Sequence, residues 1–232
     1  VDRRQRQMCI RDRLPISFFK AYDNNQSNNN ILAGANGQMF FGFSSRNQIP
    51  KTHFYGQLFI DEIRVESIFN KSKSRNQFAY QLGASITDVY FPTMTLTAEY
   101  TRINPFVYRN FIPAENYTSA SYYLGDWMGA NADRLLLQAS YRPIAKLSTK
   151  VYLMQCFKGG QRSVEEQYFG VPQPSFGVDP LFKQRQIGLE ASYELINNVQ
   201  VHFSHINTLN RPYLQVGQSQ TVTSFGIIWS RY

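Results

Sequence analysis

The chain alternates apolar and polar residues with a period of two, in segments of about ten residues separated by turn residues. In segment 93–102, for example, Met94, Leu96 and Tyr100 share one phase and Glu99 lies in the other. Successive side chains of a β-strand point to opposite faces, so such segments predict strands that bury one face only. No apolar run approaches the roughly 18 residues of a transmembrane helix. A helical membrane protein is therefore excluded.

The predicted strands number about ten, and their connections differ in length. The strands are 14–22, 38–45, 53–64, 77–88, 93–102, 133–142, 146–158, 186–195, 199–205 and 221–232. Short links at 90–92, 143–145 and 196–198 alternate with long links at 65–76, 103–132, 159–185 and 209–220. This alternation is typical of outer-membrane barrels, which have tight periplasmic turns and long outer loops.

Charged residues within the strands fall almost entirely in the polar phase, while Arg102, at a strand end, lies in the apolar phase. A basic residue facing lipid at mid-depth costs roughly 2 to 4 kcal/mol, so lipid contact would select this partition. We therefore predict an all-β, antiparallel up-and-down transmembrane β-barrel, with a soluble β-sandwich as the alternative. The predicted lumen-lining residues are Glu99, Arg134, Arg142, Lys150, Lys158 and Glu190.

The composition fits this reading. Charged residues make up 17% of the chain, below the roughly 25% of ordinary globular proteins, and aromatic residues reach 15%. The net charge of +8 favours an anionic partner, which could be nucleic acid, an anionic lipid surface or an acidic polysaccharide. Several aromatic residues lie near predicted strand ends, as in the interfacial belts of membrane proteins.

Residues 1–13 differ from the remainder, because they hold five Arg and two Asp with no glycine, proline, aromatic residue or alternation. We interpret this segment as foreign to the natural sequence, and a basic arm is the alternative. Without it the net charge is +5. Residues 14–232 are then expected to be the C-terminal part of a single barrel whose N-terminal part is missing.

The sequence contains no recognisable catalytic or metal-binding arrangement. It lacks the nucleophile-elbow, zinc-protease and P-loop patterns. His202 and His205 are three residues apart on a predicted strand, so they face opposite sides and cannot share a metal ion. We therefore expect a protein that is not an enzyme and that needs no metal or cofactor. A barrel hydrolase would require a nucleophile and a base that the sequence does not present.

The two longest predicted loops are rich in aromatic, Asn and basic residues. Aromatic faces stack on sugar rings, while Asn and Arg bind hydroxyl and carboxylate groups. The loops therefore predict glycan contacts, and the equally weighted alternative is that they pack on one another and plug the barrel mouth. The candidate glycan-binding residues are Asn104, Tyr108, Arg109, Asn116, Tyr117, Tyr122, Tyr123, Trp127, Arg162, Lys183 and Arg185.

Four stretches of the chain, in order, resemble the C-terminal part of the Wzi-like capsule assembly family. They are FYGQLFIDEI at 54–63, YTRINPFVY at 100–108, NYT at 116–118 and LGDWMGANAD at 124–133. The resemblance implies an outer-membrane barrel that helps to hold capsular polysaccharide at the bacterial surface. The barrels of that family are longer than this chain, and the resemblance supplies no catalytic residues.

The combined expectation is an outer-membrane barrel without enzymatic activity whose outer loops bind an acidic surface polysaccharide. Its expected partners are outer-membrane lipid and that polysaccharide, and not nucleic acid. The alternative is a porin or channel for anionic solutes, in which Arg134, Arg142, Lys150 and Lys158 line the pore.

Overall fold

Nine antiparallel strands form one sheet in the computed structural model, which describes residues 38–62, 76–110, 113, 116–120, 122–169 and 174–229. The strands of this sheet are β1 (Met39–Arg46), β2 (Thr52–Glu62), β3 (Gln77–Thr87), β4 (Met94–Ile103), β7 (Ala132–Ile144), β8 (Leu147–Gly159), β9 (Pro180–Ile196), β10 (Val199–Pro212) and β11 (Gln218–Trp229). They pair in chain order, so the sheet is an up-and-down meander. The all-β, antiparallel up-and-down architecture predicted from the alternation is confirmed.

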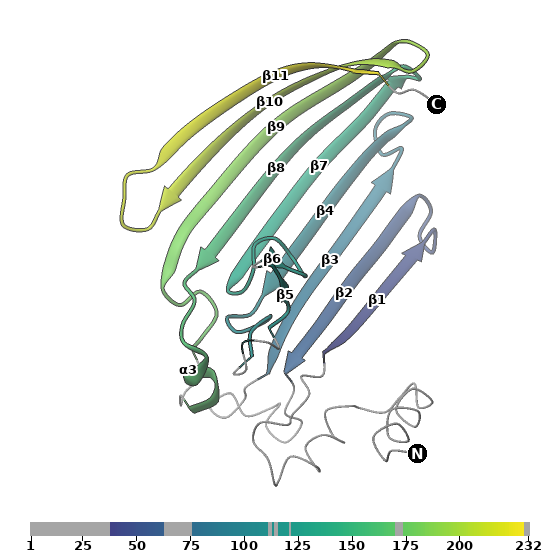
Figure 1. Cartoon of the computed structure of the whole chain (residues 1–232). Helices are drawn as coiled ribbons and strands as arrows, with labels where there is room; N and C mark the ends of the chain where they lie inside the picture. The colour runs from purple at the N-terminus through teal and green to yellow at the C-terminus, as the bar shows by residue number, and fades with distance from the viewer. Residues whose placement is uncertain are drawn as a thin grey trace, which may run out of the picture.

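The sheet is curved, and its short and long connections lie at opposite ends (Figure 1). The hairpin of β5 (Thr118–Ser119) and β6 (Tyr122–Tyr123) lies in the link between β4 and β7, and the six-residue helix α3 (Val164–Phe169) lies between β8 and β9. Within the described residues, no helix is long and apolar enough to span a membrane. The predicted strand 14–22 and the segment 1–13 lie outside the described residues.

The predicted bounds of β9 and β10 are too short, and the structure corrects them. Pairing between these strands continues through Arg185–Leu209 and Lys183–Arg211 to Phe182–Pro212. Lys183, Arg185 and Arg211 of this stretch occupy positions of the apolar phase. They interrupt the apolar–polar alternation, so the sequence pattern predicts that the strands end earlier. The predicted long link 209–220 is consequently reduced to residues 213–217. The prediction that Lys183 and Arg185 lie in an outer loop is therefore wrong.

The pairing register assigns every strand residue to one of two faces. The inward face is the one on which the β4–β7 link packs, and the outward face is the opposite one. One row of paired residues on the inward face is Tyr55, Gly83, Glu99, Leu136, Met154, Gln186 and Thr208. One row on the outward face is Phe54, Ala84, Ala98, Leu137, Leu153, Ile187 and Asn207.

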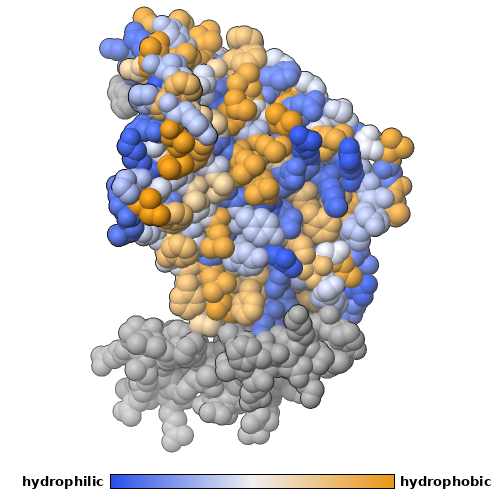
Figure 2. All heavy atoms as spheres, turned by 180° about the vertical axis from the view of Figure 1, so that it is seen from behind, coloured by the Kyte–Doolittle hydropathy of each residue, from blue (hydrophilic) through white to orange (hydrophobic). Residues whose placement is uncertain are grey.

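The buried core lies on the inward face at the long-loop end. Ala79, Ile103 and Cys156 of the strands pack there against Val107 and Met128 of the β4–β7 link. On the outward face, by contrast, many large apolar side chains are exposed. Viewed from behind, the molecule has apolar side chains over much of the middle of the sheet, interspersed with hydrophilic ones (Figure 2).

Candidate functional site

The link between β4 and β7 folds back over the end of the sheet, and its described residues 104–110, 113, 116–120 and 122–131 are called the plug below. Phe106 and Val107 are fully buried, as is Ala130 near the end of the link. Figure 1 shows the β5–β6 hairpin lying across the strands rather than extending beyond them. Of the two predicted alternatives for this loop, the structure therefore contains the packed one, with some side chains left at the surface.

Tyr108 anchors the plug. Its backbone N–H donates to Asp61 Oδ2 at 2.7 Å, and its hydroxyl oxygen accepts from the N–H of Asp126 at 3.1 Å. The residue has a φ of +72°, which is rare for a bulky side chain and persists only where the surroundings enforce it. Gly125 permits the close approach, because a Cβ there would meet the Tyr108 ring at 2.4 Å. Burial also raises the pKa of Tyr108, so the hydroxyl stays neutral at physiological pH.

An aromatic cluster surrounds this anchor. The Tyr108 ring centroid lies 5.8 Å from that of Tyr117, 5.7 Å from that of Tyr123 and 5.4 Å from that of Phe59. Such distances are typical of offset and tilted aromatic pairs, which are worth about 0.5 to 1.5 kcal/mol each beyond burial. The cluster fixes the plug to β2 on the inward face.

Asn131, buried at the end of the plug, joins it to the β8–β9 link. Its Nδ2 donates to the carbonyl oxygens of Gly160 at 2.8 Å and Val178 at 2.9 Å, and its Oδ1 accepts from the N–H of Gly177 at 2.9 Å. Its backbone N–H also donates to the carbonyl oxygen of Asn104 at 3.1 Å. One side chain thus satisfies three backbone groups of another loop, which holds the two loops in a fixed relation.

Ionic contacts tie the plug to the inward face of the strands. Arg134 Nη2 lies 3.4 Å from a carboxylate oxygen of Glu99 and 3.4 Å from one of Asp126, and the hydroxyl of Tyr55 donates to Glu99 at 2.8 Å. The ammonium of Lys158 donates to the carbonyl oxygens of Met128, at 2.7 Å, and Ala130. The positive charges of Arg134 and Lys158 are therefore engaged by groups of the protein itself.

A second charge cluster lies within the β8–β9 link. Arg162 donates to both carboxylate oxygens of Asp179, at 2.7 and 3.3 Å, and to Glu166 at 3.1 Å. This bidentate pair holds the pKa of the Asp179 carboxyl below its usual value. The same partners raise the pKa of the Arg162 guanidinium. A guanidinium nitrogen of Arg109 donates to the carbonyl oxygen of Arg162, which connects the cluster to the plug.

The accessible part of the plug combines exposed aromatic rings with a small cavity. Tyr122 is 79% exposed and Trp127 is 63% exposed. A cavity of about 340 Å³ lies between the plug and the inward face, where Gln57, Gln81 and Asp126 supply polar groups beside the Tyr117 ring. Rings that stack on C–H faces, next to amide and carboxylate groups that bind hydroxyls, suit a sugar residue.

The structure brings most of the predicted glycan-binding residues together at the long-loop end, but it divides them by exposure. Tyr108 is 4% exposed, so its ring is not available at the surface. The side chain of Asn116 accepts from the N–H of Asn110 at 2.7 Å, and the Tyr123 hydroxyl accepts from Gln161 at 2.5 Å. The partly exposed members are Asn104, Arg109, Asn116, Tyr117, Tyr123 and Arg162. Lys183 and Arg185 are separate from this cluster, on the outward face of β9.

The six predicted lumen-lining residues all lie in the inward phase of their strands. Lys150 and Glu190 are paired across β8 and β9, with their charged atoms 2.7 Å apart. Arg142 is exposed near the short-turn end. That these residues line an open lumen stays a prediction. Among the described residues, no group of three His, Cys, Asp or Glu side chains lies close enough to hold a metal ion.

Sequence reasoning did not identify Asp61 or Asn131, the two polar residues on which the plug depends. Asp61 and its neighbour Glu62 point to opposite faces of a predicted strand, so together they indicate no site. The available signal was its position in the inward phase at the end of an otherwise apolar segment, where a buried carboxylate needs a donor.

Comparison with known proteins adds little. No protein-family model and no curated protein matches the chain. A solved structure, the outer membrane channel DcaP of Acinetobacter baumannii, is similar with a TM-score of 0.48 and 9% sequence identity. The match covers 83% of this chain and 53% of that chain, so this chain spans about half the length of the channel. The resemblance to the Wzi-like family stays a prediction.

Proposed function

We propose that the chain is an outer-membrane β-barrel protein whose sheet faces lipid with its outward side and whose long-loop end binds a surface polysaccharide. The observation that carries the membrane part of this proposal is the exposure of large apolar side chains over the outward face. Leu82 is 50% exposed, Leu137 43%, Val151 48% and Ile187 44%. These residues come from four strands across the width of the sheet.

Lipid is the partner that fits this face best. Soluble monomers rarely expose apolar patches beyond a few hundred Å². On β7, the outward residues Leu135, Leu137, Ala139 and Tyr141 form an apolar run, and β3 and β4 carry equivalent runs beside it. Four alternating residues cover about 20 Å along the strand, which at a tilt of roughly 40° is about 16 Å of height, or about two thirds of the apolar band of about 25 Å on membrane barrels.

Heat-modifiable mobility tests the membrane part. The chain refolded in detergent or lipid vesicles should migrate differently in gel electrophoresis with and without boiling, and alkaline carbonate should not extract it from vesicles. A chain that stays monomeric and soluble without detergent, with no heat-dependent shift, would favour the soluble sandwich instead.

The glycan part of the proposal rests on the exposed Tyr122 and Trp127 rings and on the cavity beside Tyr117. A capsule-type polysaccharide agrees with the resemblance to the Wzi-like family. The structure changes the expected role of charge, since Arg134 and Arg162 are ion-paired within the protein and Lys158 donates to backbone carbonyl oxygens. We therefore propose that ring stacking and amide contacts contribute more to binding than does attraction of acidic groups.

Replacing Tyr122 and Trp127 together by Ala should reduce the polysaccharide retained at the surface of cells that express the chain. Tyr90→Ala with Phe91→Ala is a matched control, since these rings are 75% and 57% exposed near the short-turn end. Each stacked ring is worth about 0.5 to 1.5 kcal/mol. The double variant should therefore retain at least about fivefold less glycan than wild type. Equal retention by the variant and the control, at equal expression, would contradict the glycan proposal.

A channel is the second candidate, favoured by the polar character of the inward face toward the short-turn end. Gln138, Ser192 and His202 lie on that face, together with the Lys150–Glu190 pair. Two of the four cations expected to select anions, Arg134 and Lys150, are ion-paired, and a third, Lys158, donates to backbone carbonyl oxygens. We therefore expect any conductance to be only weakly anion-selective. Single-channel recording in a planar bilayer tests this, and a large, strongly anion-selective open pore would favour the channel over the glycan-binding barrel.

A further inference from the structure

The outward face carries a basic patch at the long-loop end. Lys183, Arg185 and Arg211 are exposed and lie in the outward phase of β9 and β10. Lys183 pairs directly with Arg211 across the two strands, and Arg185 lies two residues along β9 on the same face. Residues opposite one another in an antiparallel pair have Cβ atoms about 5 Å apart, so these like charges repel unless an anion lies between them.

The described part of the protein does not supply that anion. In the part of the chain that the structure describes, no ion pair includes Lys183, Arg185 or Arg211. The other outward cation at this end, Arg102, differs because its guanidinium lies 3.7 Å from the centre of the Phe176 ring and its pairing partner across the strands is Asp133. The three basic residues of β9 and β10 therefore form an unneutralised patch.

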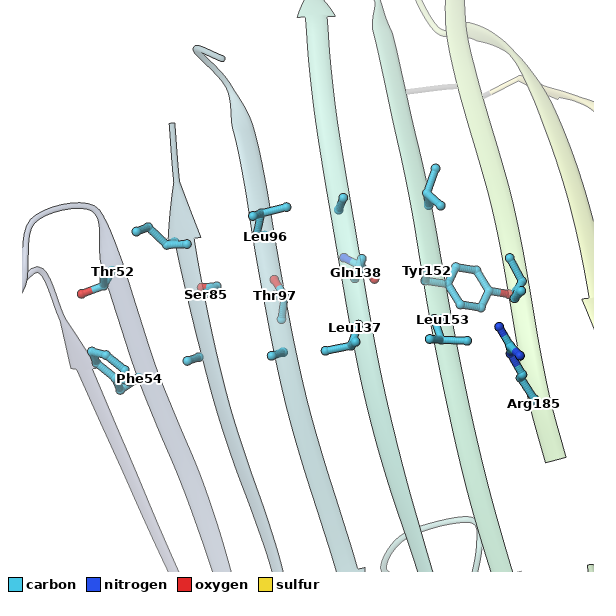
Figure 3. Close-up of a pocket in the computed structure, with 16 residues that line it drawn as sticks. Thr52, Phe54, Ser85, Leu96, Thr97, Leu137, Gln138, Tyr152, Leu153 and Arg185 are labelled. Atoms are coloured by element: carbon cyan, nitrogen blue, oxygen red, sulfur yellow. The ribbon is translucent and has the colours of Figure 1, made fainter. Parts of the chain in front are cut away.

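An apolar trough on the same face ends at this patch. Its volume is about 700 Å³, and it crosses β2, β3, β4, β7, β8 and β9. Ala84 and Ala98 pair directly and Ala139 lies diagonally beside them, so small residues form its floor between larger ones. Figure 3 shows Phe54 at one side of the trough and Arg185 at the other. Arg185 therefore belongs both to the trough and to the basic patch.

We infer that the trough and the basic patch together bind a phosphorylated, multiply acylated lipid of the lipid A type, with its acyl chains in the trough and its phosphates between Lys183, Arg185 and Arg211. This inference rests on the proposed membrane location, in which the outward face meets lipid and the long-loop end is the outer one. Phosphate oxygens match the donors of Arg and Lys, and each basic side chain near an anionic surface contributes about a fivefold factor in binding.

The width of the trough favours such a lipid over an ordinary phospholipid. Neighbouring strands are about 4.8 Å apart, close to the width of an extended acyl chain. A trough that crosses six strands offers contact, side by side, to more chains than the two of a phospholipid. Three cations likewise suit more than one phosphate group.

The test is lipid retention by the full chain refolded in a zwitterionic detergent, measured by native mass spectrometry after titration with purified bisphosphorylated lipid A or with phosphatidylglycerol. The wild-type chain should retain lipid A in preference to phosphatidylglycerol. The variant Lys183→Gln, Arg185→Gln, Arg211→Gln should bind lipid A at least about tenfold more weakly. The variant Arg46→Gln, Arg142→Gln, Lys146→Gln removes the same charge near the short-turn end and should bind like wild type.

A second variant tests the trough without changing charge. Ala98→Leu with Ala139→Leu fills the floor and should lower lipid A retention severalfold, because the acyl chains lose their contact surface. The inference would be overturned if the triple Gln variant bound lipid A as tightly as wild type does. It would also be overturned if wild type retained phosphatidylglycerol as well as it retains lipid A.

The outcomes also separate this inference from the membrane proposal. Heat-modifiable mobility of each variant shows whether the barrel is folded. If the wild-type chain shows no such mobility and associates with no lipid vesicle, the membrane proposal fails and this inference fails with it. If the chain inserts and the triple variant retains lipid A normally, this inference alone is overturned.

Discussion

The two faces of the sheet are built from alternate residues of the same strands, yet they differ in almost every physical property. On β7, Arg134 and Gln138 point inward, where Arg134 is paired with Glu99, whereas Leu135 and Leu137 point outward and remain exposed. The plug covers the long-loop end of the inward face. Among the described residues the middle of the outward face has no such cover, and Phe176 of the β8–β9 link packs on its long-loop end against Phe157 and Arg102. The comparison shows that the apolar side of the strands is not the core of this molecule, since the core lies on the inward face at one end.

The largest effect is expected from placing a charge on the outward face. Leu137→Arg puts a guanidinium at the middle of the apolar run and should destabilise the chain in a bilayer by roughly 2 to 4 kcal/mol. Gln138→Arg, the adjacent inward position, should cost less than about 1 kcal/mol. Urea unfolding in lipid vesicles measures both. Equal costs at the two positions would mean that lipid does not cover the outward face.

The next largest loss of stability is expected when the plug, which covers the long-loop end of the inward face, loses the side chain of Asn131. Asn131→Ala removes three side-chain hydrogen bonds to the β8–β9 link and places Ala at a φ of +55°. We expect the free energy of unfolding to fall by about 2 to 3 kcal/mol. Asn131→Gly removes the same bonds without the backbone strain, so its free energy of unfolding should fall by about 1 kcal/mol less than that of Asn131→Ala. Hydrogen exchange should then increase at Gly160 and Gly177 in both variants. Wild-type protection in Asn131→Gly would show that the side chain does not hold the two loops together.

The two faces were predictable from the sequence, and a packed loop was one of two predicted alternatives, but the contacts that hold the plug were not predictable. Alternation assigns Leu137 and Gln138 to opposite faces without reference to any other strand. The partners of Asn131 are backbone groups of Gly160, Gly177 and Val178, and no local pattern connects an Asn to a loop 29 residues or more away. Tyr108 and Tyr122 likewise look equivalent in the sequence, although one is buried and the other is 79% exposed.

The same limit explains the strand ends. Lys183, Arg185 and Arg211 interrupt the apolar phase, so the pattern predicts loops where β9 and β10 continue to pair. A membrane strand can carry basic residues where it reaches the lipid headgroups, because there the cost of a charge falls to roughly 0 to 1 kcal/mol. With the proposed membrane location, the rule that places charges on the inward face holds at mid-depth and fails near the lipid headgroups.

A smaller effect is expected at the Lys150–Glu190 pair on the inward face, whose charged atoms are 2.7 Å apart and whose side chains are 35% and 25% exposed. A double-mutant cycle with Lys150→Gln and Glu190→Gln should give a coupling free energy of about 0.5 to 1 kcal/mol, as is usual for partly exposed ion pairs. Urea unfolding of the four proteins in vesicles measures this coupling. A coupling above about 2 kcal/mol would indicate a drier inward face than a polar lumen implies.

The smallest effect is a pH dependence confined to the β8–β9 link. Arg162 holds the pKa of the Asp179 carboxyl below its ordinary value of 3.8. The ion pair therefore stabilises the link fully at pH values above 3.8. The contribution is present while Asp179 is ionised and is lost as the pH falls through its lowered pKa. Proteolysis of the link by an acid protease should therefore accelerate below about pH 4 in wild type. Asp179→Asn lacks the pair at every pH, so its cleavage should already be faster at pH 6 and should change less with acidification. A wild-type chain whose cleavage rate rises at neutral pH instead would show that another group controls the opening of the link, since a carboxylate paired with arginine cannot lose its charge there.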